Sequence, residues 1–234
     1  MRTCPQQVRW RSVPGAVLGA VLAAGLASCS SSSDALSGLT ADQIASKAVA
    51  DFGTVPAVTM SGTFSNSGQA FSIDITLTRS KGCTGLVSQG SSGSVQLIKV
   101  GSTLWIKPDS QFWATEGLTN ASALKAVSGK YVETGSSSSM AQLGDLCDVS
   151  QLVQAMGTSY HGMSKGATTT IAGQQALAIN TANSGVLYVT VASAPRLLRV
   201  DGGSQGHLTF SYGPSPNLTP PPASETVNGA QYGF

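Results

Sequence analysis

Two neighbouring runs of the chain, 58–64 and 71–77, alternate apolar with polar residues, and a short polar stretch at 65–68 separates them. Successive side chains of a β-strand point to opposite faces, so this alternation predicts two half-buried strands joined as a hairpin. Its apolar face consists of Val58, Met60, Phe64, Phe71, Ile73, Ile75 and Leu77. These residues are either core packed beneath helices or, in part, the lining of a ligand pocket.

Further strands extend this hairpin. A third is expected from Cys83, a fourth at 95–100 and a fifth at 103–107, and the short turns between them predict an antiparallel meander. Later in the chain a second group of strands is predicted at 160–164, 168–171, 175–180, 186–192, 196–200 and 207–212. Together with the helices described next, this pattern indicates an α+β domain.

A helix is predicted before the first strand. Thr40 and Gln43 have the spacing of a capping box, and Ile44, Ala48 and Phe52 recur every four residues. The result is an amphipathic helix of about twelve residues whose narrow apolar stripe would lie on a sheet.

The stretch 109–157, between the two groups of strands, is predicted to be mainly helical. Phe112 and Trp113 are its apolar anchors. Helices are predicted within it at 121–127, 140–146 and 148–156.

The first residues have the order of a secretory signal. Arg2, Arg9 and Arg11 precede a weakly apolar run that is shorter than the roughly 20 residues of a membrane span. The run ends in Leu26-Ala27-Ser28-Cys29, and serines follow. This tetrad resembles the lipobox of bacterial lipoproteins, which implies cleavage before Cys29, a diacylglycerol on its sulfur and an acylated amino terminus. The alternatives are cleavage to a free secreted protein and an uncleaved anchor.

The lipobox divides the chain. We expect a signal peptide at 1–28, a serine-rich tether at 29–38, one domain at 39–213 and a proline-rich tail at 214–234. The mature protein would be exported and held at the outer face of the plasma membrane by the lipid on Cys29.

The net charge of the chain limits the kinds of molecule that it could bind. The leader holds three of the 13 basic residues and none of the 11 acidic ones, so its removal changes the net charge from +2 to about −1. A nearly neutral chain without a basic stripe argues against nucleic acid as a partner. We expect a monomer that needs no cofactor.

Two cysteines remain in the predicted domain, Cys83 and Cys147. In an exported protein such a pair most simply forms one disulfide, with two free thiols as the alternative. A metal site is disfavoured because His161 and His207 are not at ligand spacing from either cysteine.

Catalytic motifs occur only as weak matches. Residues 162–166 fit G-x-S-x-G around Ser164, but a strand-forming run follows where a nucleophile elbow needs a helix. Residues 122–125 fit S-x-x-K, yet neither companion motif, S-D-N or K-T-G, is present. We therefore do not expect an enzyme.

Two longer segments resemble a known family. They are 100–107, Val-Gly-Ser-Thr-Leu-Trp-Ile-Lys, leading to Phe112-Trp113, and 208–213, Leu-Thr-Phe-Ser-Tyr-Gly, before the prolines at 220–222. Over nearly all of residues 38–225 the chain resembles the LppX/LprG group of actinobacterial lipoproteins, within the wider LolA-like fold.

That resemblance implies a curved antiparallel half-barrel sheet, with helices on its concave face and acyl chains held between sheet and helices. The group carries lipids or lipoglycans across the envelope. This chain departs from the group at the expected Cys83–Cys147 bridge, which would tie the covering helices down and restrict a wide cavity.

The leading functional hypothesis is therefore a membrane-anchored lipoprotein that binds or carries an acylated lipid or lipoglycan in the cell envelope. The alternative is a structural or protein-interaction lipoprotein with a filled core.

Overall fold

One sheet organises the part of the chain that the computed structural model describes, which is residues 35–66, 68–80, 82–135, 139–156 and 161–232. The predicted leader and Cys29 lie outside these residues. The strands are β1 (Ala57–Asn66), β2 (Gln69–Thr78), β3 (Cys83–Gln89), β4 (Ser94–Val100), β5 (Thr103–Pro108), β6 (Tyr131–Glu133), β7 (Ser164–Ile171), β8 (Gln174–Asn180), β9 (Val186–Thr190), β10 (Leu197–Asp201), β11 (Gly206–Gly213) and β12 (Thr226–Asn228).

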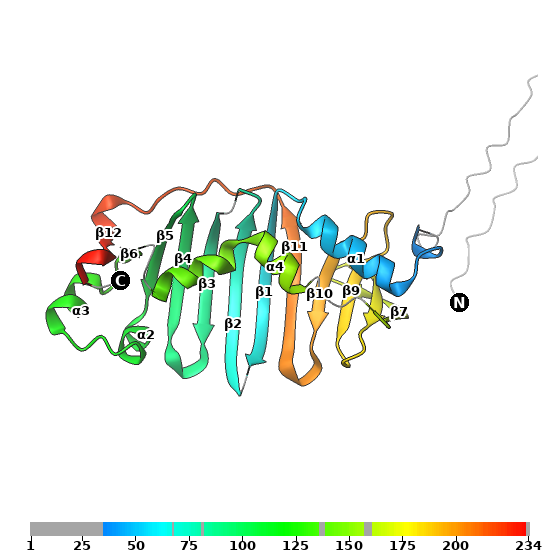
Figure 1. Cartoon of the computed structure of the whole chain (residues 1–234), viewed down its shortest axis with the longest axis horizontal. Helices are drawn as coiled ribbons and strands as arrows, with labels where there is room; N and C mark the ends of the chain where they lie inside the picture. Colours follow the sequence, from blue (N-terminus) through cyan, green and yellow to red (C-terminus); the bar gives the residue numbers. More distant parts are fainter. Residues whose placement is uncertain (1–34, 67, 81, 136–138, 157–160, 233–234) are drawn as a thin grey trace, which may run out of the picture. The chain divides into compact units, whose positions relative to one another are not determined.

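Twelve strands form this sheet in the order β12-β6-β5-β4-β3-β2-β1-β11-β10-β9-β8-β7 (Figure 1). Neighbours pair antiparallel except β12 with β6, which are parallel. The two edges are β12 and β7, so the sheet is open. The expected α+β half-barrel class is confirmed.

The predicted hairpin lies at the centre of the sheet. β1 and β2 pair from Ala57 opposite Thr78 to Asn66 opposite Gln69, which confirms the alternation read from the sequence. On its other side β1 pairs with β11, so it connects the first meander to the second group of strands.

The helices beside this sheet include α1 (Ala41–Phe52), α2 (Ser110–Thr115), α3 (Ala121–Val127), the 3₁₀ helix η3 (Ser139–Cys147) and α4 (Val149–Met156). Figure 1 shows α4 crossing in front of the central strands and α1 in front of the β9 and β10 side. No helix in the described ranges has the length and hydropathy of a membrane span.

α1 forms as its sequence predicts. The Thr40 amide donates to Gln43 Oε1 over 2.8 Å, and the Gln43 amide donates to Thr40 Oγ1 over 3.2 Å, so the capping box is complete. Its apolar stripe is buried, and Phe52 packs edge-on against Phe210 with ring centroids 5.5 Å apart. Burial of this stripe fixes α1 on the sheet.

Residues 140–146 differ from the α-helix predicted there and form part of the 3₁₀ helix η3. Lys99 Nζ donates to the Gly144 carbonyl over 3.0 Å. In an α-helix the amide of Asp148 would also donate to this carbonyl. That amide donates instead to the Asp145 carbonyl, three residues back, which is the bonding of a 3₁₀ helix.

Two further differences concern strands. The segment predicted at 168–171 lies within β7, whose register with β8 shifts between Lys165 and Thr168. The strand predicted at 160–164 is wrong for residues 161–163, which are not in a strand, and only Ser164 of it belongs to β7; residue 160 lies outside the described part. The sequence predicts an extended tail from residue 214. Figure 1 shows this segment running along the strand ends to β12, which pairs with β6 at the far edge.

Gly62 gives a test of the central pairing. A Cβ atom added to it would lie 2.2 Å from the His207 carbonyl oxygen of β11, and its φ of +153° disfavours other residues. Gly62→Ala should lower the free energy of unfolding by at least about 2 kcal/mol in urea titrations. The control is Gly213→Ala, whose Cβ would lie in open space at the end of β11. It should change the free energy of unfolding by less than about 0.5 kcal/mol. Equal effects of the two changes would contradict the close approach.

Candidate functional site

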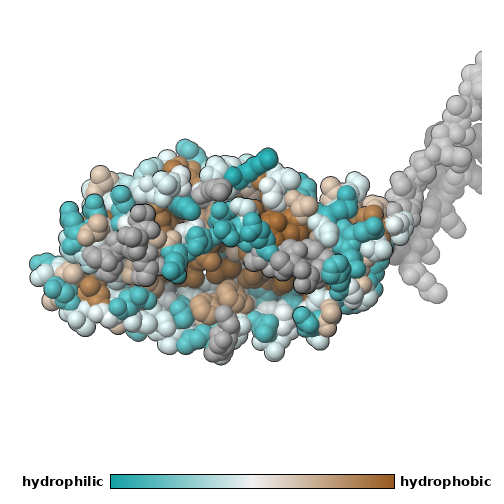
Figure 2. Space-filling model, in the orientation of Figure 1, coloured by the Kyte–Doolittle hydropathy of each residue, from teal (hydrophilic) through white to brown (hydrophobic). Residues whose placement is uncertain are grey.

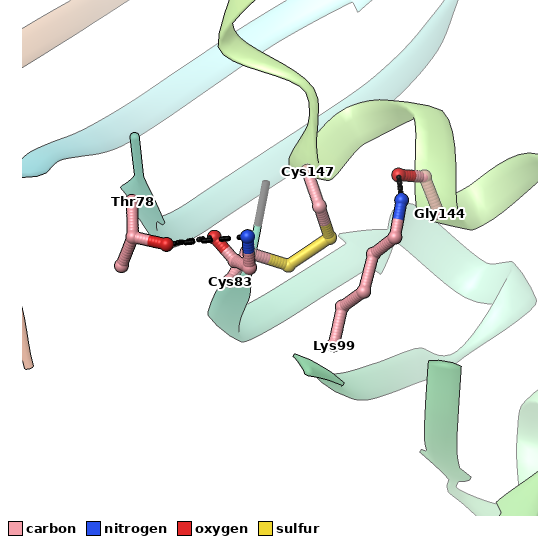
Figure 3. Close-up of a disulfide and its surroundings, with 6 residues drawn as sticks. Thr78, Cys83, Lys99, Gly144 and Cys147 are labelled. Carbon is pink, nitrogen blue, oxygen red and sulfur yellow. Dashed lines mark hydrogen bonds between the residues drawn. A yellow bond between two sulfur atoms is a disulfide. The ribbon is translucent and has the colours of Figure 1, made fainter. Parts of the chain in front are cut away.

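A cover formed by η3 and α4 lies over the sheet and is tied to it by the disulfide between Cys83 and Cys147 (Figure 3). The two Cα atoms are 5.2 Å apart and both residues are fully buried. Lys99 of β4 donates to the Gly144 carbonyl in the same turn of η3, three residues before Cys147. The predicted disulfide is present in the structure, and it anchors the cover where β3 begins.

The turn that leads to Cys83 is itself fixed. Thr78 is 1% exposed, the one polar residue of the described core, and its hydroxyl donates to the Gly82 carbonyl over 3.0 Å. The Gly82 amide donates to the same hydroxyl oxygen over 3.2 Å. Because a buried hydroxyl must find partners, this turn has little freedom. Cys83 is therefore held at a fixed position for Cys147.

A cavity of about 400 Å³ lies between the cover and the central strands. Its lining is almost wholly apolar, and comes from β1 to β4, β11, α2, η3 and α4. The lining residues are Met60, Phe64, Phe71, Ile73, Ile75, Val87, Gln89, Gly93, Val95, Phe112, Leu143, Leu146, Leu152 and Leu208. Figure 2 shows apolar residues gathered in a hollow near the middle of this face.

The seven residues of the predicted apolar face divide between this cavity and the core. Met60, Phe64, Phe71, Ile73 and Ile75 line the cavity. The cross-strand pair Val58 and Leu77 does not; these two side chains are 1% and 0% exposed within the core. The face is therefore pocket lining at the end of the hairpin near its turn and packed core at the other end.

Burial changes steadily along β2. Phe71 and Ile73 are half-buried, whereas Ile75 is fully buried. Phe64 stacks on Phe71 at the outer end, with ring centroids 5.2 Å apart. The cavity is thus closed at the Ile75 end and open towards the strand ends near Phe71.

Several lining residues were not identified from the sequence as pocket residues. Leu143 and Leu146 come from η3, where their spacing of three places both on one side of a 3₁₀ helix. Leu152 comes from α4, and Phe112, expected only as an anchor, lies at the mouth. The sequence signal that could have found the first two is the spacing of three between Leu143 and Leu146. In the structure Leu146 stays 42% exposed, which the sequence does not show.

Asp109 fixes the part of the mouth that α2 provides. It is the N-cap of α2 and accepts from the Phe112 amide over 2.8 Å. Its other oxygen accepts from the Ser94 amide over 2.8 Å and from the Ser94 hydroxyl over 2.7 Å. Burial raises the pKa of this carboxyl, but these hydrogen bonds outweigh it, so that the pKa lies below its ordinary value.

The weak catalytic motifs do not gather into a site. Ser164 begins β7 with an exposed side chain, and His161 is exposed beside it, whereas His207 lies on β11 opposite Asp201. Among the described residues no group of three or more His, Cys, Asp or Glu side chains could hold a metal ion. The cavity offers apolar binding, and its described lining holds no set of groups for bond cleavage.

Comparison with solved structures supports the fold. The chain is similar to LprF from Mycobacterium bovis, with a TM-score of 0.53, 15% identity and coverage of 78% of this chain and 97% of that one. An uncharacterized conserved protein from Thermus thermophilus matches with a TM-score of 0.36, 10% identity, and 77% and 96% coverage. The Pseudomonas aeruginosa MucA/MucB complex matches with a TM-score of 0.32, 11% identity, and 75% and 58% coverage.

No protein-family model matches the chain, and no curated protein does. At 15% identity, the likeness to LprF shows a shared fold.

The Asp109 bonds predict a pH-dependent loss of stability. A lowered pKa in the folded state stabilises the protein above the ordinary pKa of an aspartate, and this stabilisation is lost as pH falls through the lower, folded-state value. Asp109→Ala should cost about 1 kcal/mol of unfolding free energy at pH 7, and Asp109→Asn, which keeps one acceptor, should cost less. The gap in unfolding free energy between wild type and Asp109→Asn should close as pH falls through the folded-state pKa of Asp109. Urea titrations at several pH values would measure it, and a gap that widens in acid would contradict this account.

Proposed function

We propose that this chain is an exported lipoprotein that binds an acyl lipid non-catalytically in the cavity beneath η3 and α4. The observation that carries the proposal is the apolar cavity of about 400 Å³ with its open end near Phe71. Apolar enclosure suits a hydrocarbon chain, because each buried methylene contributes roughly 0.8 kcal/mol to binding. The resemblance to the LppX/LprG group and the LprF-like fold support the same class of ligand.

The attachment is the second part of the proposal. Cys29 carries the lipid anchor and the chain is held at the outer face of the plasma membrane. About 11 residues separate Cys29 from the start of α1, and an extended chain covers at most about 3.5 Å per residue. The tether therefore keeps the domain within about 40 Å of the membrane surface, close enough to exchange lipid with it. Transfer of lipid within the envelope is the activity we infer.

The experiment measures lipid that copurifies with the protein. A soluble form of residues 30–234 is produced in an actinobacterial host, desalted gently and weighed by native mass spectrometry. The wild type should carry extra mass that becomes extractable acyl lipid on denaturation. Ile73→Trp fills the cavity and should reduce this lipid at least tenfold, because the indole occupies the space of the ligand.

Ile98→Trp is the matched control, since Ile98 is half-buried on β4 and does not line the cavity. It should keep the wild-type lipid load. Thermal unfolding checks that both variants are folded. A folded wild type with a clean apo mass, and no uptake when envelope lipids are added, would reject the lipid carrier in favour of an interaction protein.

A further inference from the structure

The cavity differs in polarity between its two ends. At the closed end the cross-strand pair Met60 and Ile75 is at most 5% exposed. At the open end the described lining includes a single polar side chain, that of Gln89, which is half-buried. A ligand that fits both ends is apolar at one tip and polar at the other.

The Gln89 carboxamide is available to such a ligand. Its backbone amide donates to the Gly93 carbonyl over 2.9 Å, which fixes the end of β3, but the side chain makes no hydrogen bond to any described residue. A carboxamide offers both a donor and an acceptor. It can therefore bond to an ester, an amide or a hydroxyl group without any charge.

The position of Gln89 is set by a tight contact with α2. Gly93 has a φ of +97°, and a Cβ added there would lie 2.3 Å from the Phe112 amide nitrogen. Only glycine lets the turn after β3 approach α2 so closely. Gln89 and Phe112 thus stand together at the mouth, one polar and one aromatic.

The volume of the cavity suits one hydrocarbon chain. A methylene group is about as large as a water molecule, which takes about 30 Å³ in the liquid. A cavity of about 400 Å³ therefore accommodates about 13 methylene groups. This matches one medium-length acyl chain.

We propose that the ligand is a single-chain acyl lipid with an uncharged polar linkage, which enters methyl end first and hydrogen-bonds through that linkage to Gln89. This inference rests on the proposed function and narrows it. On this proposal the site selects its ligand by two features, the number of acyl chains and the uncharged polar linkage.

Chain selection is tested with delipidated residues 30–234, which contain every described element, and with thermal unfolding as the check of folding. The probes are monoacylglycerols of 8 to 18 carbons and 1,2-dimyristoylglycerol. Affinity should rise about fourfold per added methylene up to about 14 carbons and then level off. The two-chain lipid should bind no more tightly than 1-myristoylglycerol.

A continued rise to 18 carbons, or a diacylglycerol that binds more than tenfold tighter, would overturn the single-chain assignment while leaving lipid binding intact. A folded protein that binds none of the probes would reject the proposed function itself.

The Gln89 contact is tested by Gln89→Leu, which keeps the approximate size of the side chain and removes its polar atoms. Binding of 1-myristoylglycerol should weaken about fivefold, as expected for one neutral hydrogen bond, while binding of tridecane, which has no linkage, should not weaken. Gln96→Leu, an exposed position on β4 outside the lining, should change neither. Equal loss for both probes in Gln89→Leu would show that Gln89 only supports the fold.

Discussion

The structure depends on the pairing of β1 with both β2 and β11. β1 is the only strand that connects the first meander to the second within the described sheet, and its apolar side chains face the helices only in one register. A slip of one residue would turn Met60 and Phe64 away from the cover. Gly62 holds this register, since the β11 backbone lies where any larger side chain would be.

The disulfide determines where the cavity can exist. A bridge between Cys83 and Cys147 was expected to restrict a wide cavity by tying the cover down. In the structure the bridge lies at the start of β3, and the open end of the cavity lies at Gln89, where β3 ends. The cover is therefore clamped at the junction of η3 and α4, over the start of β3, and the cavity opens towards the end of β3. On the chain-entropy model, closing a loop of 64 residues stabilises the fold by about 4 kcal/mol.

Local patterns predicted several local features correctly, although the α-helix predicted at 140–146 is a 3₁₀ helix. Alternation at 58–64 and 71–77 specified the hairpin, Thr40 and Gln43 specified the start of α1, and counting cysteines specified the bridge. These features could be predicted because each depends on residues whose spacing is visible in the sequence.

Contacts between distant segments could not be predicted in this way. Thr209 of β11 bonds to Ser61 of β1 across 148 positions, and no local pattern indicates that pairing. The division of the apolar face was also hidden, because Ile73 and Leu77 have the same alternation. Only the position of the cover, set by Cys147 and by the bond from Lys99 to Gly144, decides which residues face the cavity.

The most direct test of the central claim is photocrosslinking with an acyl probe that carries a diazirine near its methyl end. The account predicts attachment at the closed end of the cavity, at Met60 or Ile75, mapped by peptide mass spectrometry. Attachment mainly at Leu86, which is 40% exposed and lies outside the cavity lining, or no labelling above that of denatured protein, would contradict it.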